Sequence, residues 1–308
     1  MAKFRIYNVQ VLPGTVSQGD IGVSGYKKIF AEFREKTKAA YREKRLTSFH
    51  AEAGAKSFFG PQEFHVRAGY VWGYFVRYKS SEDLQNIYTR ESVKKTRQIA
   101  QSVKDMLFVF DCRQHFLAIA EANGGLPENS DVERILKDYL SPIAAEFFPQ
   151  HQLDVFLVAD KKSLDQIFES AAGFGRIEID LSFPNGTAED TLDAMKQARI
   201  NRFKASVSPA TSGQIDRKIP QFLVDLMRGA MTYGKVRATY FTQSESKTGV
   251  EIRKNYDSDA DPLTIEKHQG KEESDEDFVL RCRDELTQIV RVNNLSGQQI
   301  PLDTDDEE

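Results

Sequence analysis

Glu178 and Asp180 have the spacing that a metal-dependent nuclease would use. Residues two apart in an extended strand point to one face, so the segment from Gly175 to Phe183 would present both carboxylates together. Clustered carboxylates are what Mg²⁺ prefers in such sites. However, no Glu-x-Lys sequence follows at the distance typical of a restriction-type nuclease core. We therefore keep a metal-dependent nuclease as an alternative and expect no metal site.

A second candidate pair is Arg45 and His50, which match the Arg-x4-His arrangement of HEPN ribonucleases. In that arrangement the two side chains serve an attack by the RNA 2′-hydroxyl. A chain this rich in basic residues gives about one such pair by chance. The strand-like segment from Phe64 to Lys79 also does not suggest an all-helical domain. A metal-independent ribonuclease is therefore a further alternative.

The remaining reactive residue types indicate no catalytic site or cofactor. Cys112 and Cys282 are the only cysteines, too few for a disulfide framework or a four-ligand zinc site, and this fits a reducing cytoplasm. No apolar run approaches the length of a membrane-spanning helix, and the chain starts directly in a strand-like pattern. We therefore expect a cytoplasmic protein without a cofactor, and we favour a non-enzymatic function.

Charge is distributed unevenly along the 308 residues, although the formal net charge is only -4. Residues 257–308 contain 16 Asp and Glu against 5 Lys and Arg, whereas the preceding residues contain 30 acidic and 37 basic ones. A basic body attracts polyanions because each neutralised phosphate releases condensed counterions. The sequence thus predicts a nucleic-acid partner, with DNA favoured, and an acidic tail that competes for the same surface.

Basic residues on the polar positions of predicted strands and on helices are the candidate phosphate contacts. They form a binding surface only if helices leave those sheet faces open. Under a helix, their charged groups would extend only to solvent at the edges of the sheet. No recognition-helix, zinc-finger or RNP pattern accompanies them, so we expect little sequence preference. The predicted contacts are Arg67, Arg77, Lys79, Arg90, Lys94, Lys95, Arg97, Arg202, Lys204, Lys235, Arg237 and Arg253.

In the first half of the chain, periodicity predicts the elements that would position these residues. Phe4 to Leu12 is predicted as a strand, and Tyr26 to Leu46 as a basic amphipathic helix. Phe64 to Lys79 alternates as one long strand with a bend at its glycines, and a polar helix carrying Arg90 to Lys104 follows. Met106 to Ala120 is predicted as a hairpin.

In the second half, Ser130 and Glu133 have capping-box spacing and predict the start of a helix. Later helices are predicted at Lys161 to Ser170 behind Asp160, at Pro220 to Tyr233, and from Ser274 onward. The predicted strands are Leu153 to Ala159, Gly175 to Phe183, Arg202 to Val207, and the hairpin of Lys235 to Thr242 with Val250 to Lys254.

Helices and hairpins alternate without strict βαβ order, which predicts an α+β fold with two mixed sheet-and-helix domains. The linker-like run EANGGLPENS separates an N-terminal domain, residues 1–121, from a C-terminal domain, residues 130–256. Residues 257–308 would form an acidic segment with a terminal helix and a flexible tail.

The order of several segments is similar to that in a set of uncharacterised bacterial proteins that accompany phage-defence genes. These look like relatives of the phage-exclusion protein RexA and the Kiwa-system protein KwaB. The segments are VWGYFVRYK, MLFVFDCRQHFLAIAE, DVFLVAD, FGRIEIDLSFPNG and GKVRATYFTQ, and the resemblance spans about Phe64 to Lys254. It includes no catalytic motif, so no functional residue is transferred.

The resemblance implies an intracellular α+β protein that binds DNA with little sequence preference, forms homo-oligomers, and works with a second defence-system protein. For a KwaB-like protein that partner would be membrane-bound. Our leading hypothesis is therefore an anti-phage defence protein that binds nucleic acid. The alternatives are an effector nuclease of either kind above and a protein-interaction subunit of a defence complex.

Overall fold

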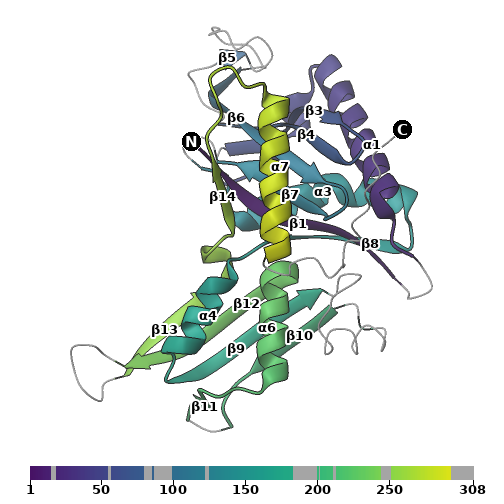
Figure 1. The fold of residues 1–308 in the computed structure, drawn as a ribbon. Helices are drawn as coiled ribbons and strands as arrows, with labels where there is room; N and C mark the ends of the chain where they lie inside the picture. Colours follow the sequence, from purple (N-terminus) through teal and green to yellow (C-terminus); the bar gives the residue numbers. More distant parts are fainter. Residues whose placement is uncertain are drawn as a thin grey trace.

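The computed structural model describes residues 1–14, 19–54, 57–79, 85–86, 99–121, 125–182, 200, 202–210, 213–243 and 251–292. Over these residues the chain forms helices packed against two antiparallel sheets (Figure 1). The predicted α+β class is confirmed.

The larger sheet is organised around the long first strand. Within the described residues its order is β14-β1-β7-β6-β4-β3-β2, with β8 also pairing with β1 and β5 with β6. Ala2 to Arg5 pair with β14, and Tyr7 to Pro13 pair with β8, so β1 pairs with strands from the middle and from the late part of the chain. The strands are β1 (Ala2–Pro13), β2 (Ala51–Glu52), β3 (Ser57–Val66), β4 (Tyr70–Lys79), β5 (Gln85–Asn86), β6 (Ile99–Asp111), β7 (Phe116–Ala120), β8 (His151–Leu157) and β14 (Thr264–Lys267).

Helices cover both faces of this sheet. On one face, α1 (Gly22–Arg42) and α3 (Asn129–Phe147) bury side chains such as Phe30 and Ile135 in the main core. The short α2 (Leu46–Phe49) follows α1. On the other face, α7 (Asp275–Val292) packs Phe278 and Leu286 against the sheet (Figure 1).

The smaller sheet has the order β10-β9-β12-β13, and β11 also pairs with β9. Its strands are β9 (Gly173–Ser182), β10 (Arg202–Val207), β11 (Ile215–Asp216), β12 (Gly234–Gln243) and β13 (Glu251–Asp257). Two helices, α4 (Lys161–Ser170) and α6 (Gln221–Tyr233), pack on one face through Leu164 and Met227 (Figure 1). No helix of the described chain covers the other face, which we call the open face.

Most of the predicted elements are confirmed. The agreement is best where a local signal in the sequence marks the boundary of an element. Helix α4 spans Lys161–Ser170 as predicted, and the Asp160 side chain accepts a hydrogen bond from the Lys162 amide. Strand β10 spans Arg202–Val207, and β6 and β7 form the predicted hairpin. The turn and helix predicted after Phe183 lie outside the described residues.

Three local predictions are wrong. The segment from Phe64 to Lys79 is not one strand, because the chain turns between Val66 and Tyr70 and the two halves pair as β3 and β4. Lys104 lies in β6 and not in a helix. Glu133 does not cap α3, because its carboxylate accepts a hydrogen bond from the Leu157 amide of β8 at 2.8 Å instead.

Elements from all three predicted segments meet in the larger sheet. Helix α3 and strand β8 pack there, and so do β14 and α7 from the acidic segment. The domain boundaries themselves stay a prediction. Within the described chain, no helix is long and apolar enough to cross a membrane.

Candidate nucleic-acid interface

The open face of the smaller sheet is polar because β9 alternates between buried apolar and polar residues from Arg176 to Leu181. Ile177, Ile179 and Leu181 are buried against α4 and α6. Arg176, Glu178 and Asp180 alternate with them and so point to the opposite side. The alternation that suggested a carboxylate pair thus builds a mixed-charge surface.

On β10, Arg202 and Lys204 both bind Asp180. The Arg202 guanidinium donates two hydrogen bonds to the carboxylate, at 2.8 and 2.7 Å, and Lys204 Nζ lies 3.2 Å from Oδ2. Burial alone would raise the pKa of Asp180, but these hydrogen bonds outweigh it and lower the pKa below its usual range. Asp180 therefore stays ionised between two cations.

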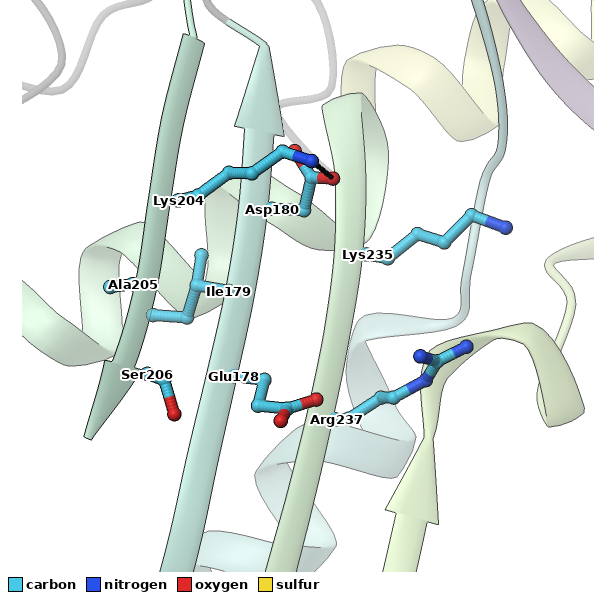
Figure 2. Close-up of a pocket in the computed structure, with 8 residues that line it drawn as sticks. All are labelled: Glu178, Ile179, Asp180, Lys204, Ala205, Ser206, Lys235 and Arg237. Atoms are coloured by element: carbon cyan, nitrogen blue, oxygen red, sulfur yellow. Dashed lines mark ion pairs between the residues drawn. The ribbon is translucent and has the colours of Figure 1, made fainter. Parts of the chain in front are cut away.

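Strand β12 adds cations on the other side of β9. Figure 2 shows Lys204 reaching across to Asp180, while Lys235 and Arg237 project from β12 on the side away from Lys204. These side chains and Glu178 line a shallow pocket of about 430 Å³. A second hollow of about 400 Å³ shares Glu178 and Arg237 and extends to β13. The two hollows make the open face continuous across four strands.

Positive charge exceeds negative charge on the open face, but only modestly. Direct cross-strand neighbours lie on the same face, which assigns each residue by register. The cations are Arg176, Arg202, Lys204, Lys235, Arg237 and Arg253, and the carboxylates are Glu178, Asp180, Asp216, Glu251 and Asp257. Five of the predicted contacts therefore lie on one face of the sheet. Four of them are exposed there, whereas Lys235 is held by Glu133 of α3 and by Asp259.

The predicted contacts of the larger sheet do not join this surface. Arg67 donates two hydrogen bonds to Glu276 of α7, at 2.6 and 2.8 Å. Arg77 is half-buried and donates to the backbone carbonyls of Gly125 and Leu126, which is a structural role. Lys79 is exposed at the end of β4. Four predicted contacts lie outside the described residues: Arg90, Lys94, Lys95 and Arg97.

The acidic segment supplies carboxylates to several of these cations. Asp257 accepts a hydrogen bond from Arg237 at 2.8 Å, and Asp259 lies 2.7 Å from Lys235 Nζ. The hydrogen bonds from Arg67 lower the pKa of Glu276 to about 2. Part of the charge difference between the two sequence regions is thus neutralised within the fold.

The geometry does not favour Glu178 and Asp180 as metal ligands. Asp180 is bound by Arg202 and Lys204, and Arg176 Nη2 lies 2.7 Å from Glu178. Across the described ranges, no group of three or more His, Cys, Asp or Glu side chains is placed to hold a metal ion. A metal would have to displace cations that already neutralise both carboxylates.

Arg45 and His50 lie in different environments, because His50 is buried and Arg45 is exposed. His50 is 5% exposed, and its ring nitrogens lie 2.9 Å from the Pro61 carbonyl and 3.2 Å from the Tyr78 hydroxyl. Burial lowers the pKa of His50 to about 4. Arg45 instead pairs with Glu43 at the surface. A substrate hydroxyl would find the imidazole enclosed, so the arrangement does not favour a ribonuclease site.

Both thiols are also enclosed. Cys112 and Cys282 are fully buried in different cores, and burial raises the pKa of each to about 12. They are neutral at physiological pH and act as small core residues.

The sequence analysis did not predict a role at this surface for Arg176 or Glu133. Arg176 could have been predicted, since it is separated from Glu178 and Asp180 by even numbers of residues and so points to the same face of β9. Glu133 could not, because its contact with Lys235 at 2.9 Å joins residues far apart in the chain.

Comparison with protein families gives one match that spans nearly the whole chain. The family described as "Domain of unknown function (DUF4747)" matches residues 3–290. No curated protein matches the sequence.

Proposed function

The chain belongs to the DUF4747 family of unknown function, and we propose that it binds nucleic acid, with DNA favoured, along the open face of the smaller sheet. The observation that carries this proposal is the gathering of Arg202, Lys204, Arg237 and Arg253 on one uncovered surface. A backbone of phosphates is the ligand that such a spread of cations fits best.

The ion pairs on this face do not prevent binding. The Arg237 and Asp257 side chains are 57% and 40% exposed, and Lys204 is 65% exposed. Exposed pairs of this kind contribute about 0 to 1 kcal/mol each. A phosphate can therefore replace or share a carboxylate at little cost, and release of counterions from the nucleic acid favours the exchange.

Binding would be directed to the backbone and not to the bases. The described part of the open face presents strands and carries Phe241 as its one aromatic side chain, above Gly175. Reading bases in the major groove requires a protruding helix or ribbon, and stacking requires several exposed rings. The expected result is affinity with little sequence preference.

The biological setting is proposed from the resemblance to relatives of RexA and KwaB. On that basis the protein acts in the cytoplasm in anti-phage defence, as a homo-oligomer with a second defence-system protein that is membrane-bound in KwaB-like systems. A test is whether deleting the gene raises phage plaquing efficiency in its native host. Unchanged plaquing across a broad phage panel would count against this role.

A salt titration tests the binding proposal. Full-length protein should bind a labelled duplex of arbitrary sequence at low salt, with affinity that falls steeply as salt rises. The triple variant Arg202→Gln, Lys204→Gln, Arg253→Gln should lower the salt slope by about 3, since each phosphate contact contributes about 0.9. The control Lys271→Gln removes a cation between β14 and α7. No binding at low salt, or equal loss in the control, would refute the proposal.

A protein-interaction subunit is the alternative with an observation in its favour. The open face carries both signs of charge, which suits a protein partner with a complementary pattern. Such a subunit would co-purify with a partner and show a 260 to 280 nm absorbance ratio typical of protein alone. The nuclease alternatives are tested by incubating the protein with plasmid or total RNA, with magnesium or with EDTA.

A further inference from the structure

Strand β10 forms one edge of the smaller sheet (Figure 1). All six of its residues, Arg202 to Val207, pair with β9, and no other described strand pairs with it. The backbone N–H and C=O groups of alternate residues point to opposite sides of an antiparallel strand, so half of those in β10 point away from β9. An edge of this kind can pair with a further strand.

Folded proteins usually protect their strand edges against such pairing, and other edges of this chain are protected. In the larger sheet, β2 and β14 are only two and four residues long. Strand β3 carries Pro61 and a bulge beside it, and β8 carries the buried carboxylate of Asp154. At the opposite edge of the smaller sheet, β13 places the charged Lys254 on the side that the helices cover.

Strand β10 lacks these protections along its six residues. Its ladder with β9 contains no bulge. On the side that the helices cover, its residues are apolar and only partly buried, namely Phe203, Ala205 and Val207. Its two cations, Arg202 and Lys204, lie on the open face, where both bind Asp180. The edge is therefore suited to a partner strand with apolar residues on the same side.

A second copy of β10 has these properties. A two-fold axis perpendicular to the sheet keeps each face on its own side, so residues that face each other must be separated by an even number of positions along the strand. With Ala205 on the axis, Phe203 lies opposite the second copy's Val207. Lys204 then lies opposite the second copy's Ser206, and no two like charges face each other.

The neighbouring registers are less favourable. An axis at Lys204 would place two ammonium groups face to face, and an axis at Phe203 would place Arg202 opposite Lys204. An axis at Ser206 would place Phe203 opposite Pro209, which has no N–H to donate to the ladder. The sequence of the edge thus selects Ala205 as the centre of the pair.

We infer that the chain forms a two-fold symmetric dimer in which two copies of β10 pair antiparallel about Ala205. Main-chain hydrogen bonds across the axis provide affinity, and the apolar pairs of Phe203 with Val207 fix the register. The two smaller sheets become one continuous sheet. The homo-oligomer proposed above came from a resemblance, whereas this interface comes from the edge itself.

One consequence rests on the proposed function. Because the axis is perpendicular to the sheet, the two open faces lie side by side on one surface. Four strands from each copy, about 4.8 Å apart, span about 34 Å. This length matches about one helical turn of a DNA duplex. The dimer would therefore offer its cations along a whole turn of the nucleic acid.

Analytical ultracentrifugation of the full-length protein without nucleic acid tests the dimer. The wild type should sediment at micromolar concentration with twice the mass of one chain. Ala205→Lys places two like charges face to face at the axis and should raise the dimer dissociation constant about a hundredfold. Ile252→Lys is the matched control, because Ile252 lies on the same side of the sheet at the opposite edge and is 44% exposed. It should leave the mass unchanged.

Mixing two variants tests the register. Ala205→Lys and Ala205→Glu should each be monomeric, and an equimolar mixture should dimerise, because opposite charges then meet at the axis. Circular dichroism and the thermal midpoint check that each variant is folded. Ser206→Lys provides a second test at an exposed position, since it places a like charge opposite Lys204 of the second copy and should also give a monomer.

Four results would overturn the inference. These are a monomeric wild type, a dimer that Ala205→Lys and Ser206→Lys leave intact, an equal loss in Ile252→Lys, and a mixture of the two Ala205 variants that stays monomeric. Strand pairing with a different protein would give the first of these results.

The outcome is separable from that of the proposed function, because the mass is measured without nucleic acid. A wild-type dimer that depends on Ala205 but binds no duplex would refute the open-face proposal and leave the interface standing. A wild-type monomer that binds duplex would do the reverse. Where both hold, the monomeric Ala205→Lys should bind duplex with about half the salt slope of the dimer, since one open face replaces two. Equal slopes would show that the two faces do not act together.

Discussion

Lys235 of β12 forms an ion pair with Glu133 of α3, with 2.9 Å between Nζ and Oε2. The pair joins the two sheets, because Lys235 belongs to β12 whereas Glu133 accepts a hydrogen bond from the Leu157 amide of β8. Lys235 also forms an ion pair with Asp259. The Lys235 and Glu133 side chains are 25% and 10% exposed. Burial would lower the pKa of Lys235, but Glu133 and Asp259 outweigh it and raise the pKa, so the ammonium stays charged. A residue predicted to contact DNA is therefore first a structural link.

Substituting Lys235→Met should destabilise the fold by about 3 kcal/mol, because the buried Glu133 carboxyl, whose pKa burial already raises, loses the cation that favours its charged form. Urea unfolding at neutral pH measures the loss. The double variant Lys235→Met, Glu133→Gln should recover part of it, since the uncompensated charge is gone while the Leu157 amide keeps an acceptor. A Lys235→Met protein with wild-type stability would show that the pair is not a structural link.

Arg77 and Arg253 were both predicted to contact phosphates of the nucleic acid. In the structure Arg77 is partly buried, whereas Arg253 is exposed. Arg77→Ala should cost about 2 kcal/mol of stability, because the carbonyls of Gly125 and Leu126 and the Ser57 hydroxyl lose a charged donor. Its DNA affinity when folded should be unchanged. Arg253→Ala should do the opposite, since it lies exposed on β13. Urea denaturation and fluorescence anisotropy measure both quantities for both variants. A loss of DNA affinity in folded Arg77→Ala, or unchanged affinity in Arg253→Ala, would contradict the prediction.

Two truncations separate the acidic residues from the core. A chain ending at Tyr256 loses β14 and α7, including the buried Phe278, Val279 and Leu286, and should not fold. A chain ending at Val292 keeps all of these and removes the acidic end DTDDEE. It should stay folded and bind duplex DNA a few-fold more tightly at low salt, with the gain vanishing at high salt. Equal affinity at low salt would show that this end does not compete.

Local signals explain which elements were predictable. Asp160 defines the start of α4 by capping it, and the alternation of β9 identifies its two faces without any tertiary information. The predicted cations on β10, β12 and β13 gather because antiparallel neighbours share their faces. The face to which each residue of a strand points could thus be predicted from the sequence.

Long-range pairing explains what was not predictable. Ala2 to Arg5 pair with Thr264 to Lys267, and nothing near either segment indicates that partner. The capping-box pattern at Glu133 was overridden because β8 and β12 offered its carboxylate a donor and a cation. The turn after Val66 was hidden because the alternating pattern continues on both sides of it. At Glu133 a tertiary contact outweighed a capping preference worth about 1 kcal/mol.

His50 should make the stability of the protein depend on pH between about 7 and 5. Burial lowers its pKa from an ordinary 6.5 to about 4, so in this range the unfolded chain binds a proton that the folded chain does not. Stability is therefore complete above pH 6.5 and is lost as pH falls toward the folded pKa, by about 2 kcal/mol at pH 5. The variant His50→Gln has no titratable group at this position. Urea unfolding at about pH 7 and about pH 5 should show that its free energy of unfolding falls less than that of the wild type, by about 2 kcal/mol. An identical loss in the two proteins would mean that His50 protonates freely in the folded state, and so is open to solvent and to substrates.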